Sequence, residues 1–421
     1  MIYFSKALRS AAGTALALTF LNTACEKTPP PFQCRDSIGC VQIAGGEPVK
    51  IGVLQALSGK VAPLGREQVR GIELAIEKRR GTILDHLISL QIEDTGCTQE
   101  GGANAAMKLI ADPQMVAILG TTCSGAAAAA SKAMSEAGLT MISGNNSAPF
   151  LTTVDGQRAP DWHPGYFRTA FNEQASGKTA ALFAFHNLGL RKAATINDGD
   201  IYSRGLTDGF EKVFKELGGR IVLAASIDRG DPEMRPVLNA VLDADARLLF
   251  FPLFQPEGNQ ILRQARETPG FEQITLMSDG ALIESSFIEN LRDLARGMYF
   301  VGPASPVGPA VDVLADVYET KYHAKPAASY YLNAYDAAGL LMQSLEKATV
   351  LDSDGTLHIG RQRLRDTLYA TQDYAGATGM LGCNEFGDCA RPVFNVLRLD
   401  NPEAGVKGLQ SNVMFSFSPV K

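Results

Sequence analysis

Several signatures of common protein classes are missing from this sequence. It has no run of basic residues and no interleaving of aromatic with basic residues, and its formal net charge is −6. Composition therefore gives no reason to expect a nucleic-acid partner. The 5 histidines are scattered without HxxH or HxxxH spacing, and no cysteines form a CxxC pair. These spacings disfavour a metal site.

Motifs for the commoner catalytic machineries are also absent. The sequence contains no GxSxG elbow, no GxxxxGK[ST] loop and no GxGxxG after the first expected strand,. The sequence does not exclude a catalytic pair of carboxylates, because it does not reveal which acids meet in space. We predict a protein that is not an enzyme and that needs no cofactor.

The N-terminus has the pattern of an export signal. Lys6 and Arg9 precede an apolar stretch over residues 11–21 that is too short to span a bilayer,. Small residues then lead to Cys25 in the sequence LNTAC, which resembles a bacterial lipobox. We predict a signal peptide over 1–24, a lipid on Cys25 and a tether over 25–48 that begins with the proline-rich EKTPPPF. The alternative is an ordinary secretory signal with a bystander cysteine.

The other cysteines suggest disulfides. Removing Cys25 leaves six, an even number in an exported chain,. Sequence alone does not choose among the possible pairings, but spacing favours two small loops and one longer link. The favoured pairs are Cys34 with Cys40, Cys383 with Cys389, and Cys97 with Cys123.

From about residue 49 onward, apolar runs alternate with segments of helical periodicity. The candidate strands are nearly continuous apolar runs, as expected for strands buried on both faces of a parallel sheet. They cover 50–54, 87–93, 115–119, 139–142, 193–196, 220–224, 247–251, 274–277 and 298–301, and helical segments include 66–79, 100–111, 204–217, 257–266 and 327–347. This alternation predicts an α/β protein, and the number of strands favours two lobes.

The loops after these strands are rich in hydroxyls, amides and glycines. In open parallel sheets, ligands bind at the carboxyl ends of the strands. A helix that starts there offers free backbone N–H groups and the positive end of its dipole, which suits a carboxylate. Taken singly, Ser124, Ser147 or the turn at Asp279 would be an ordinary cap or turn,.

Four segments, in order and at fitting spacing, carry a family resemblance. From about Val49 to about Leu399 the chain resembles the type I periplasmic solute-binding proteins of the leucine/isoleucine/valine-binding branch. The segments are IGVL through Ser58-Gly59 to Gly65 with the helix GIELA; DTGC with GTTCS; SAPFLT leading to YFRT; and Pro256-Glu257 through LRQAR to MSDG.

The resemblance implies two doubly wound parallel-sheet lobes joined by three hinge crossovers. Residues 49–167 and 302–391 would form lobe 1, and residues 168–301 and 392–421 would form lobe 2. It also implies a monomeric, membrane-anchored extracytoplasmic or periplasmic protein that closes on a small ligand and delivers it to an inner-membrane ABC permease. A ligand-sensing receptor of the same fold is the alternative.

The resemblance also implies a ligand site. Ser124 would bind the ligand carboxylate, the loop Asn145, Asn146 and Ser147 would supply further contacts, Tyr202 would cover the ligand, and Asp279 would take its ammonium, while Phe254 and Leu64 stand where relatives have aromatic residues. Asn145 and Asn146 replace a small apolar pair, and Gln255 replaces the second aromatic after Phe254. These departures count against a simple branched-chain specificity, whereas an anion pole at Ser124 and an acid at Asp279 together favour an amino acid or a close analogue.

Overall fold

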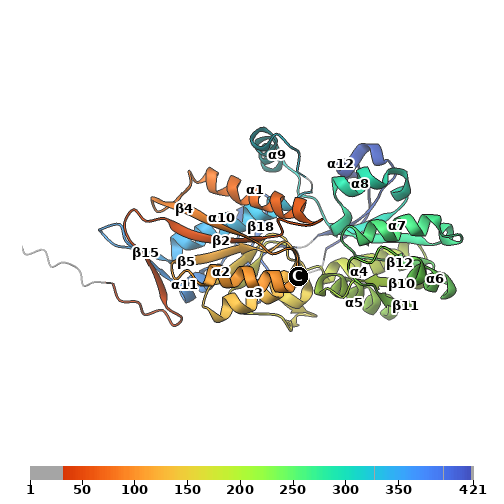
Figure 1. Ribbon diagram of the computed structural model, residues 1–421, viewed down its shortest axis with the longest axis horizontal. Helices are drawn as coiled ribbons and strands as arrows, with labels where there is room; N and C mark the ends of the chain where they lie inside the picture. The colour runs from red at the N-terminus through yellow and green to blue at the C-terminus, as the bar shows by residue number, and fades with distance from the viewer. Residues whose placement is uncertain (1–31, 327, 392, 419–421) are drawn as a thin grey trace, which may run out of the picture. The chain divides into compact units, whose positions relative to one another are not determined.

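The computed structural model describes residues 32–326, 328–391 and 393–418. The predicted signal peptide and Cys25 lie outside the described residues. Residues 34–418 form two lobes, each an α/β sandwich built around its own sheet (Figure 1). This confirms the predicted fold class. Among the described residues, no helix combines the length and the apolar character that crossing a bilayer requires.

The first lobe is built on a six-stranded sheet in the order β3-β4-β2-β5-β6-β9, in which every neighbouring pair is parallel except β3 with β4. The strands are β2 (Val49–Gln55), β3 (Thr82–Ile83), β4 (His86–Asp94), β5 (Met115–Gly120), β6 (Thr140–Ser143) and β9 (Tyr166–Arg168). All residues of β5 are buried, as its continuous apolar run predicts,.

Helices cover both faces of this sheet. They are α1 (Ala62–Lys78), α2 (Gln99–Ile110), α3 (Ser124–Glu136), α10 (Tyr330–Ala348) and α11 (Arg361–Tyr369). Helix α9 (Pro309–Tyr322) packs on α1 and α10 instead. One core contains Val53, Ile72 and Leu341, and a second contains Leu109, Ile118 and Met134. The sheet is therefore buried between two apolar layers, which is the arrangement that parallel sheets require.

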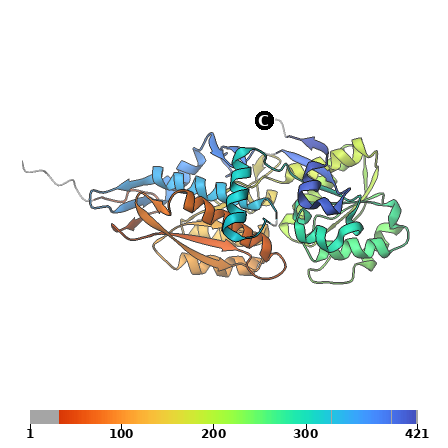
Figure 2. The same ribbon diagram turned by 90° about the horizontal axis from the view of Figure 1, so that it is seen from above.

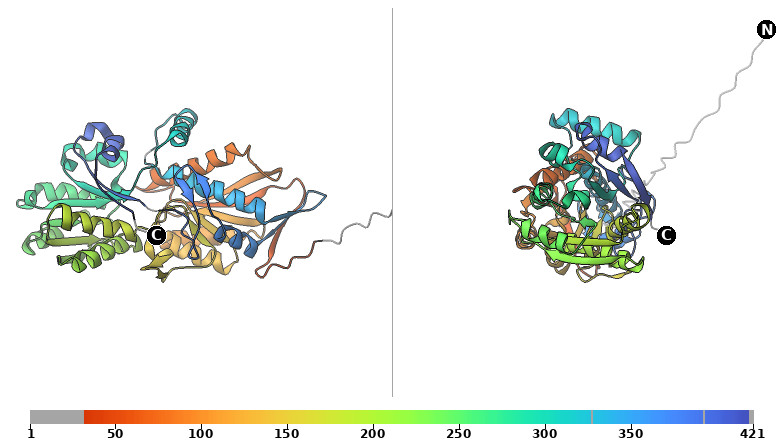
Figure 3. Two further views of the ribbon diagram at one scale, coloured as in Figure 1. Left: turned by 180° about the vertical axis from the view of Figure 1, so that it is seen from behind. Right: turned by 90° about the vertical axis from the view of Figure 1, so that its right-hand side faces the viewer.

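The second lobe has a seven-stranded sheet in the order β11-β10-β12-β13-β14-β19-β20. Its strands are β10 (Lys192–Asn197), β11 (Arg220–Ser226), β12 (Leu248–Phe250), β13 (Thr275–Asp279), β14 (Tyr299–Pro303), β19 (Phe394–Arg398) and β20 (Val413–Phe417), and its helices are α4 (Gln174–Leu182), α5 (Ile201–Glu216), α6 (Arg235–Asp243), α7 (Glu257–Glu267), α8 (Ser285–Leu291) and α12 (Gly405–Ser411). The last two strands are antiparallel to their neighbours, and Figure 3 shows this C-terminal segment on the second lobe from behind.

The chain passes between the lobes three times: after β9, after β14, and before β19 (Figure 2). At the first passage, Arg168 forms a parallel bridge with Asp388, which lies just before the third. The segments that connect the lobes are thus held against one another.

The predicted tether over 25–48 is wrong for its last part. Strand β1 (Cys40–Ile43) pairs antiparallel with β16 (Leu357–Gly360), which also pairs with β15 (Thr349–Leu351). Val41 and Ile43 belong to the core of the first lobe. Their alternation with polar neighbours is a strand signal, but four residues are too few to separate it from a loop in the sequence.

The structure contains the three disulfides that spacing favoured. They join Cys34 to Cys40, Cys97 to Cys123 and Cys383 to Cys389. The short hairpins β7 (Thr153–Val154) with β8 (Gln157–Arg158) and β17 (Tyr374–Gly376) with β18 (Gly379–Leu381) complete the described strands.

Candidate functional site

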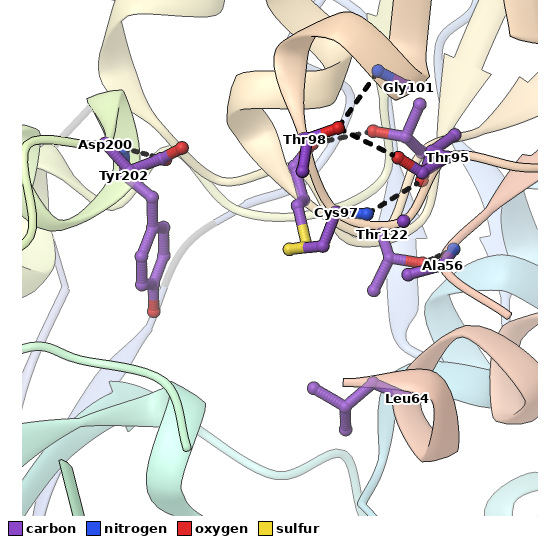
Figure 4. The surroundings of a disulfide bond; sticks show 12 residues. Ala56, Leu64, Thr95, Cys97, Thr98, Gly101, Thr122, Asp200 and Tyr202 are labelled. Atoms are coloured by element: carbon purple, nitrogen blue, oxygen red, sulfur yellow. Dashed lines mark hydrogen bonds between the residues drawn. A yellow bond between two sulfur atoms is a disulfide. The ribbon is translucent and has the colours of Figure 1, made fainter. Parts of the chain in front are cut away.

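The loops at the carboxyl ends of the first lobe's strands converge on the space between the lobes. Thr122 and Ser124 follow β5, Asn145 and Ser147 follow β6, and Leu64 lies in the first turn of α1. Parallel strands end at one edge of a sheet, so loops that are far apart in sequence meet there. Figure 4 shows Thr122 and Leu64 facing this space from the first lobe.

The second lobe faces them with aromatic side chains. Tyr202 projects from the first turn of α5 (Figure 4), and its ring centroid lies 5.1 Å from that of Phe254, which follows β12. Ala281, just beyond β13, completes the second lobe's share. Tyr330 belongs to the first lobe, at the start of α10. Its hydroxyl reaches across to the second lobe and donates to the carbonyl of Gly280 at 3.3 Å.

Together these side chains enclose a small cavity between the lobes. Its lining residues are Leu64, Thr122, Ser124, Asn145, Ser147, Tyr202, Phe254, Ala281 and Tyr330. The volume open to the centre of a water molecule is about 10 Å³, enough for about one water. In this arrangement the lobes are closed on each other, and a ligand the size of an amino acid enters only when they separate.

Six of the eight residues that the resemblance assigned to the site line this cavity. Asn146 does not line it: its side chain is fully buried, and its Oδ1 accepts from the backbone N–H of Thr121 at 3.0 Å while its Nδ2 donates to the Thr121 carbonyl at 2.9 Å. Asn146 thus holds the loop after β5 in place from behind. Asp279 is also fully buried and reaches the cavity through Tyr202.

Sequence reasoning missed Thr122, Ala281, Tyr330 and the buried acid Glu173. Thr122 and Ala281 lie beside residues that were singled out, so their strand-end position was a usable signal. Tyr330 lies on a helix more than a hundred residues from the nearest cavity residue of its own lobe, and nothing in the sequence connects it to the site.

Helix α3 begins at the cavity with Ser124. Its N-cap is Cys123, whose side chain makes no capping hydrogen bond. The Ser124 hydroxyl accepts from the backbone N–H of Ala148 at 3.3 Å, which ties the helix to the loop after β6. Because Ser124 lines the cavity, the N-terminus of the helix and the positive end of its dipole lie beside the cavity, an arrangement that favours an anion,. The disulfide from Cys123 to Cys97 fixes this corner to the start of α2.

Two buried acids lie on the opposite side. The Tyr202 hydroxyl donates to Oδ2 of Asp279. Ser147 donates to Oε2 of Glu173 at 2.9 Å, and the Glu173 carboxyl also lies within hydrogen-bonding reach of the Tyr202 hydroxyl. Burial raises the pKa of Glu173 to about 7. Burial, followed by the nearby Glu173, raises the pKa of Asp279 well above its ordinary value,.

Polar contacts hold the lobes together near the start of α3. Arg229 of the second lobe donates to the carbonyl of Cys97 at 3.4 Å and pairs with Asp200 at 3.3 Å. The Asp200 carboxylate lies against Gly125, where a β-carbon would overlap its Oδ2. Gly125 is therefore the point in α3 that allows the second lobe to approach.

A fully buried arginine supports the loop after β6. Arg168 donates from Nε to Oδ1 of Asp388 at 2.6 Å, and its Nη1 donates to the carbonyls of Asn146 and Ala148 at 3.1 and 2.8 Å. Asp388 belongs to the loop closed by Cys383 and Cys389. This small disulfide loop thus positions the residues on either side of Ser147.

Residues 48–393 match the family described as "Periplasmic binding protein". The chain belongs to this family. Two bacterial relatives are similar over most of the chain: the Leu/Ile/Val-binding protein homolog 3 of Brucella melitensis is 24% identical over 84% of this chain and 92% of its own. The leucine-, isoleucine-, valine-, threonine-, and alanine-binding protein of Pseudomonas aeruginosa is 24% identical over 83% and 89%.

Solved structures share the fold. The leucine-binding protein LivK of Thermotoga maritima has a TM-score of 0.75 at 24% identity, covering 88% of this chain and 99% of its own. A solute-binding protein of R. palustris, solved with benzoate, has a TM-score of 0.71 at 20% identity, covering 88% and 96%. This periplasmic binding protein fold therefore accommodates both an amino-acid-binding protein and a protein that holds an aromatic carboxylate.

The described residues contain no group of three or more His, Cys, Asp or Glu side chains arranged to hold a metal ion. The side chains that line the cavity between the lobes carry hydroxyl, amide, aromatic and aliphatic groups, which suit an organic ligand,.

Proposed function

We propose that this periplasmic binding protein captures an amino acid or a close analogue by closure of its two lobes and delivers it to an ABC permease. The observation that carries the proposal is the polarity of the cavity. Ser124 and the start of α3 lie on one side, and Tyr202 backed by Asp279 lies on the other. A zwitterion matches both poles, whereas a carboxylate without an amine matches only the first.

Closure explains how such a ligand would be held. It would bind the hydroxyls and N–H groups of the first lobe while the lobes are apart, and the second lobe's contacts would then favour the closed state. The cavity must widen to admit it, since the present volume of about 10 Å³ accommodates about one water. The chain's three passages between lobes are the natural hinge.

A thermal-shift screen tests this function. Protein beginning after Cys25 would be heated with each L-amino acid, with amino-acid amides, and with benzoate. We expect an amino acid or analogue to raise the melting temperature in a concentration-dependent manner, because a ligand of the folded state stabilises it. A shift with benzoate and none with any amine-bearing compound would contradict the proposal.

Ser124→Ala would then locate the carboxylate. We expect it to lower the affinity for the identified ligand by about tenfold or more, since hydrogen bonds to charged groups are among the stronger ones. Ser135→Ala is a matched control on the same helix, because the Ser135 hydroxyl is exposed and donates to the carbonyl of Pro164. Equal affinity in the two variants would remove Ser124 from the site.

The lipid anchor and the location outside the cytoplasm belong to the same proposal. The lipobox-like LNTAC sequence supports a lipid on Cys25,. Cys25→Ser should abolish incorporation of a labelled fatty acid and release the protein from the membrane fraction. We further propose that the protein acts as a monomer, which sedimentation of the soluble form would check.

A further inference from the structure

Tyr202 places one hydroxyl between two buried carboxylates. It donates to Asp279, and it also hydrogen-bonds Glu173. Asp279 has no exposed surface, and Glu173 is 3% exposed. The two acids come from different parts of the second lobe, at the end of β13 and just before α4.

A tyrosine hydroxyl has one proton to donate. It satisfies one of the two carboxylates, and Ser147 supplies a second donor to Glu173. Two ionised carboxylates that approach the same hydroxyl would repel each other, because water is largely excluded from the site. Without a cation, this repulsion costs stability. The arrangement is relieved when one of the acids carries a proton.

The surroundings supply little positive charge to the pair. Arg168 acts on Glu173, but its guanidinium donates to Asp388 and to the carbonyls of Asn146 and Ala148. The titratable and charged groups that face the pair from the elements packed against it are Arg168 on β9, Tyr202 on α5 and Tyr330 on α10, with Glu67 on α1 and Glu284 before α8 acting on Tyr330. Two of these five are further acids.

We infer that Glu173 and Asp279 share one proton, and that a cationic nitrogen of the ligand displaces it, so that binding releases a proton. This rests on the proposed function and extends it by assigning the amine to both acids rather than to Asp279 alone. The leaving proton passes to the solvent, and the ligand's positive charge replaces it. Glu173 thereby becomes a determinant of specificity for amines.

The direction of the pH dependence follows from this exchange. The proton is held below the raised pKa of the pair, near the value of about 7 for Glu173. A reaction that releases a proton is favoured as pH rises. The association constant should therefore rise with pH by up to about tenfold per unit below about pH 7, and level off above it.

Calorimetry measures the proton directly. L-leucine would be titrated into the protein at about pH 6.5 in buffers of different ionisation enthalpy, and the dependence of the heat on the buffer gives the number of protons released. We expect about one for the wild type and close to none for Glu173→Gln. 4-Methylpentanoate, which is leucine without its amine, should release none in either protein.

A measurement without ligand separates this inference from the proposed function. A carboxyl whose pKa is higher in the folded state loses its stabilising contribution as pH rises through that pKa. The wild type should therefore lose stability relative to Glu173→Gln between about pH 5 and pH 8, measured as a growing difference in melting temperature.

Glu284→Gln is the matched control. Burial also raises the pKa of Glu284 to about 7, and its carboxylate accepts a hydrogen bond from Ser286 at 2.9 Å. It should show the same trend in stability while leaving the proton release unchanged. A pH-independent difference for Glu173→Gln, or leucine bound without proton release, would overturn the inference. Failure of every amine to bind would overturn the proposed function, and the melting curves would still test whether Glu173 holds a proton in the folded protein.

Discussion

Asp388→Ala should destabilise this protein far more than the loss of an ordinary ion pair. Asp388 accepts from Nε of Arg168 at 2.6 Å, and the two side chains are 12% and 0% exposed. Removing the carboxylate leaves a buried guanidinium without its counter-charge. Breaking a buried pair in this way costs about 3–5 kcal/mol.

The structure offers a matched exposed pair. Arg235 and Glu267 lie 3.1 Å apart with side chains that are 53% and 62% exposed. Such pairs contribute about 0.2–1 kcal/mol, so Glu267→Ala should leave the free energy of unfolding almost unchanged. The comparison isolates burial, because both variants remove a carboxylate from an arginine.

Urea unfolding followed by tryptophan fluorescence suits this experiment. The sequence has 1 tryptophan, and Nε1 of Trp162 donates to the carbonyl of Phe386 at 3.0 Å, within the same disulfide loop as Asp388. Fluorescence therefore reports on the region that the substitution disturbs, and circular dichroism would follow the lobes as a whole.

Two further variants test the reasoning. Asp388→Asn keeps a hydrogen-bond acceptor and should cost less than Asp388→Ala. Arg168→Met combined with Asp388→Leu removes both charges and should recover part of the loss, because no unpaired charge remains. If Asp388→Ala costs no more than Glu267→Ala, burial of the Arg168–Asp388 pair does not raise the cost of removing its carboxylate.

Three other outcomes follow from the structure. Gly125→Ala should weaken binding of the identified ligand at least severalfold, as measured by isothermal calorimetry, because the added methyl overlaps Asp200 in the closed form. Unchanged affinity would mean that closure does not bring these residues together. Replacing Cys97 and Cys123 by alanine should lower the free energy of unfolding by about 3–4 kcal/mol in the chain-entropy account, and a loss below about 1 kcal/mol would count against it. Glu284→Gln should leave the free energy of unfolding nearly unchanged at about pH 5 and raise it by up to about 3 kcal/mol at about pH 8. The reason is that the pKa of Glu284 is about 7 in the folded state. Equal effects at the two pH values would show that the pKa of Glu284 is not raised by folding.

The sequence predicted most of the strands because a strand buried on both faces must be apolar throughout. Strand β5 is such a case, and the predicted run over 115–119 ends one residue before the observed end at Gly120. Strands β19 and β20 were not predicted. Both pair antiparallel at one side of the second sheet. The edge strand β20 is largely exposed and β19 is only partly buried at two of its positions, so neither is a continuous apolar run,.

For the cysteines, too, one part was predictable from the sequence and another was not. Their even number and their spacing were enough to favour the three observed disulfides, because two of the pairs are close in sequence. The position of the Cys383–Cys389 loop beside Arg168 was not predictable, since it depends on the third passage of the chain returning to the first.

By itself, the sequence determined the α/β alternation and the strand-end loops, because these depend on local periodicity. Its resemblance to a known family singled out Ser124, Ser147 and Tyr202 in loops of the kind where ligands bind parallel sheets. Only the tertiary structure decided which of them share a cavity. It moved Asn146 behind the site, added Tyr330 from a distant helix, and brought Glu173 to the Tyr202 hydroxyl beside Asp279. The reason is physical: burial and the pairing of charges depend on distances in the folded chain, and distance along the sequence does not encode them.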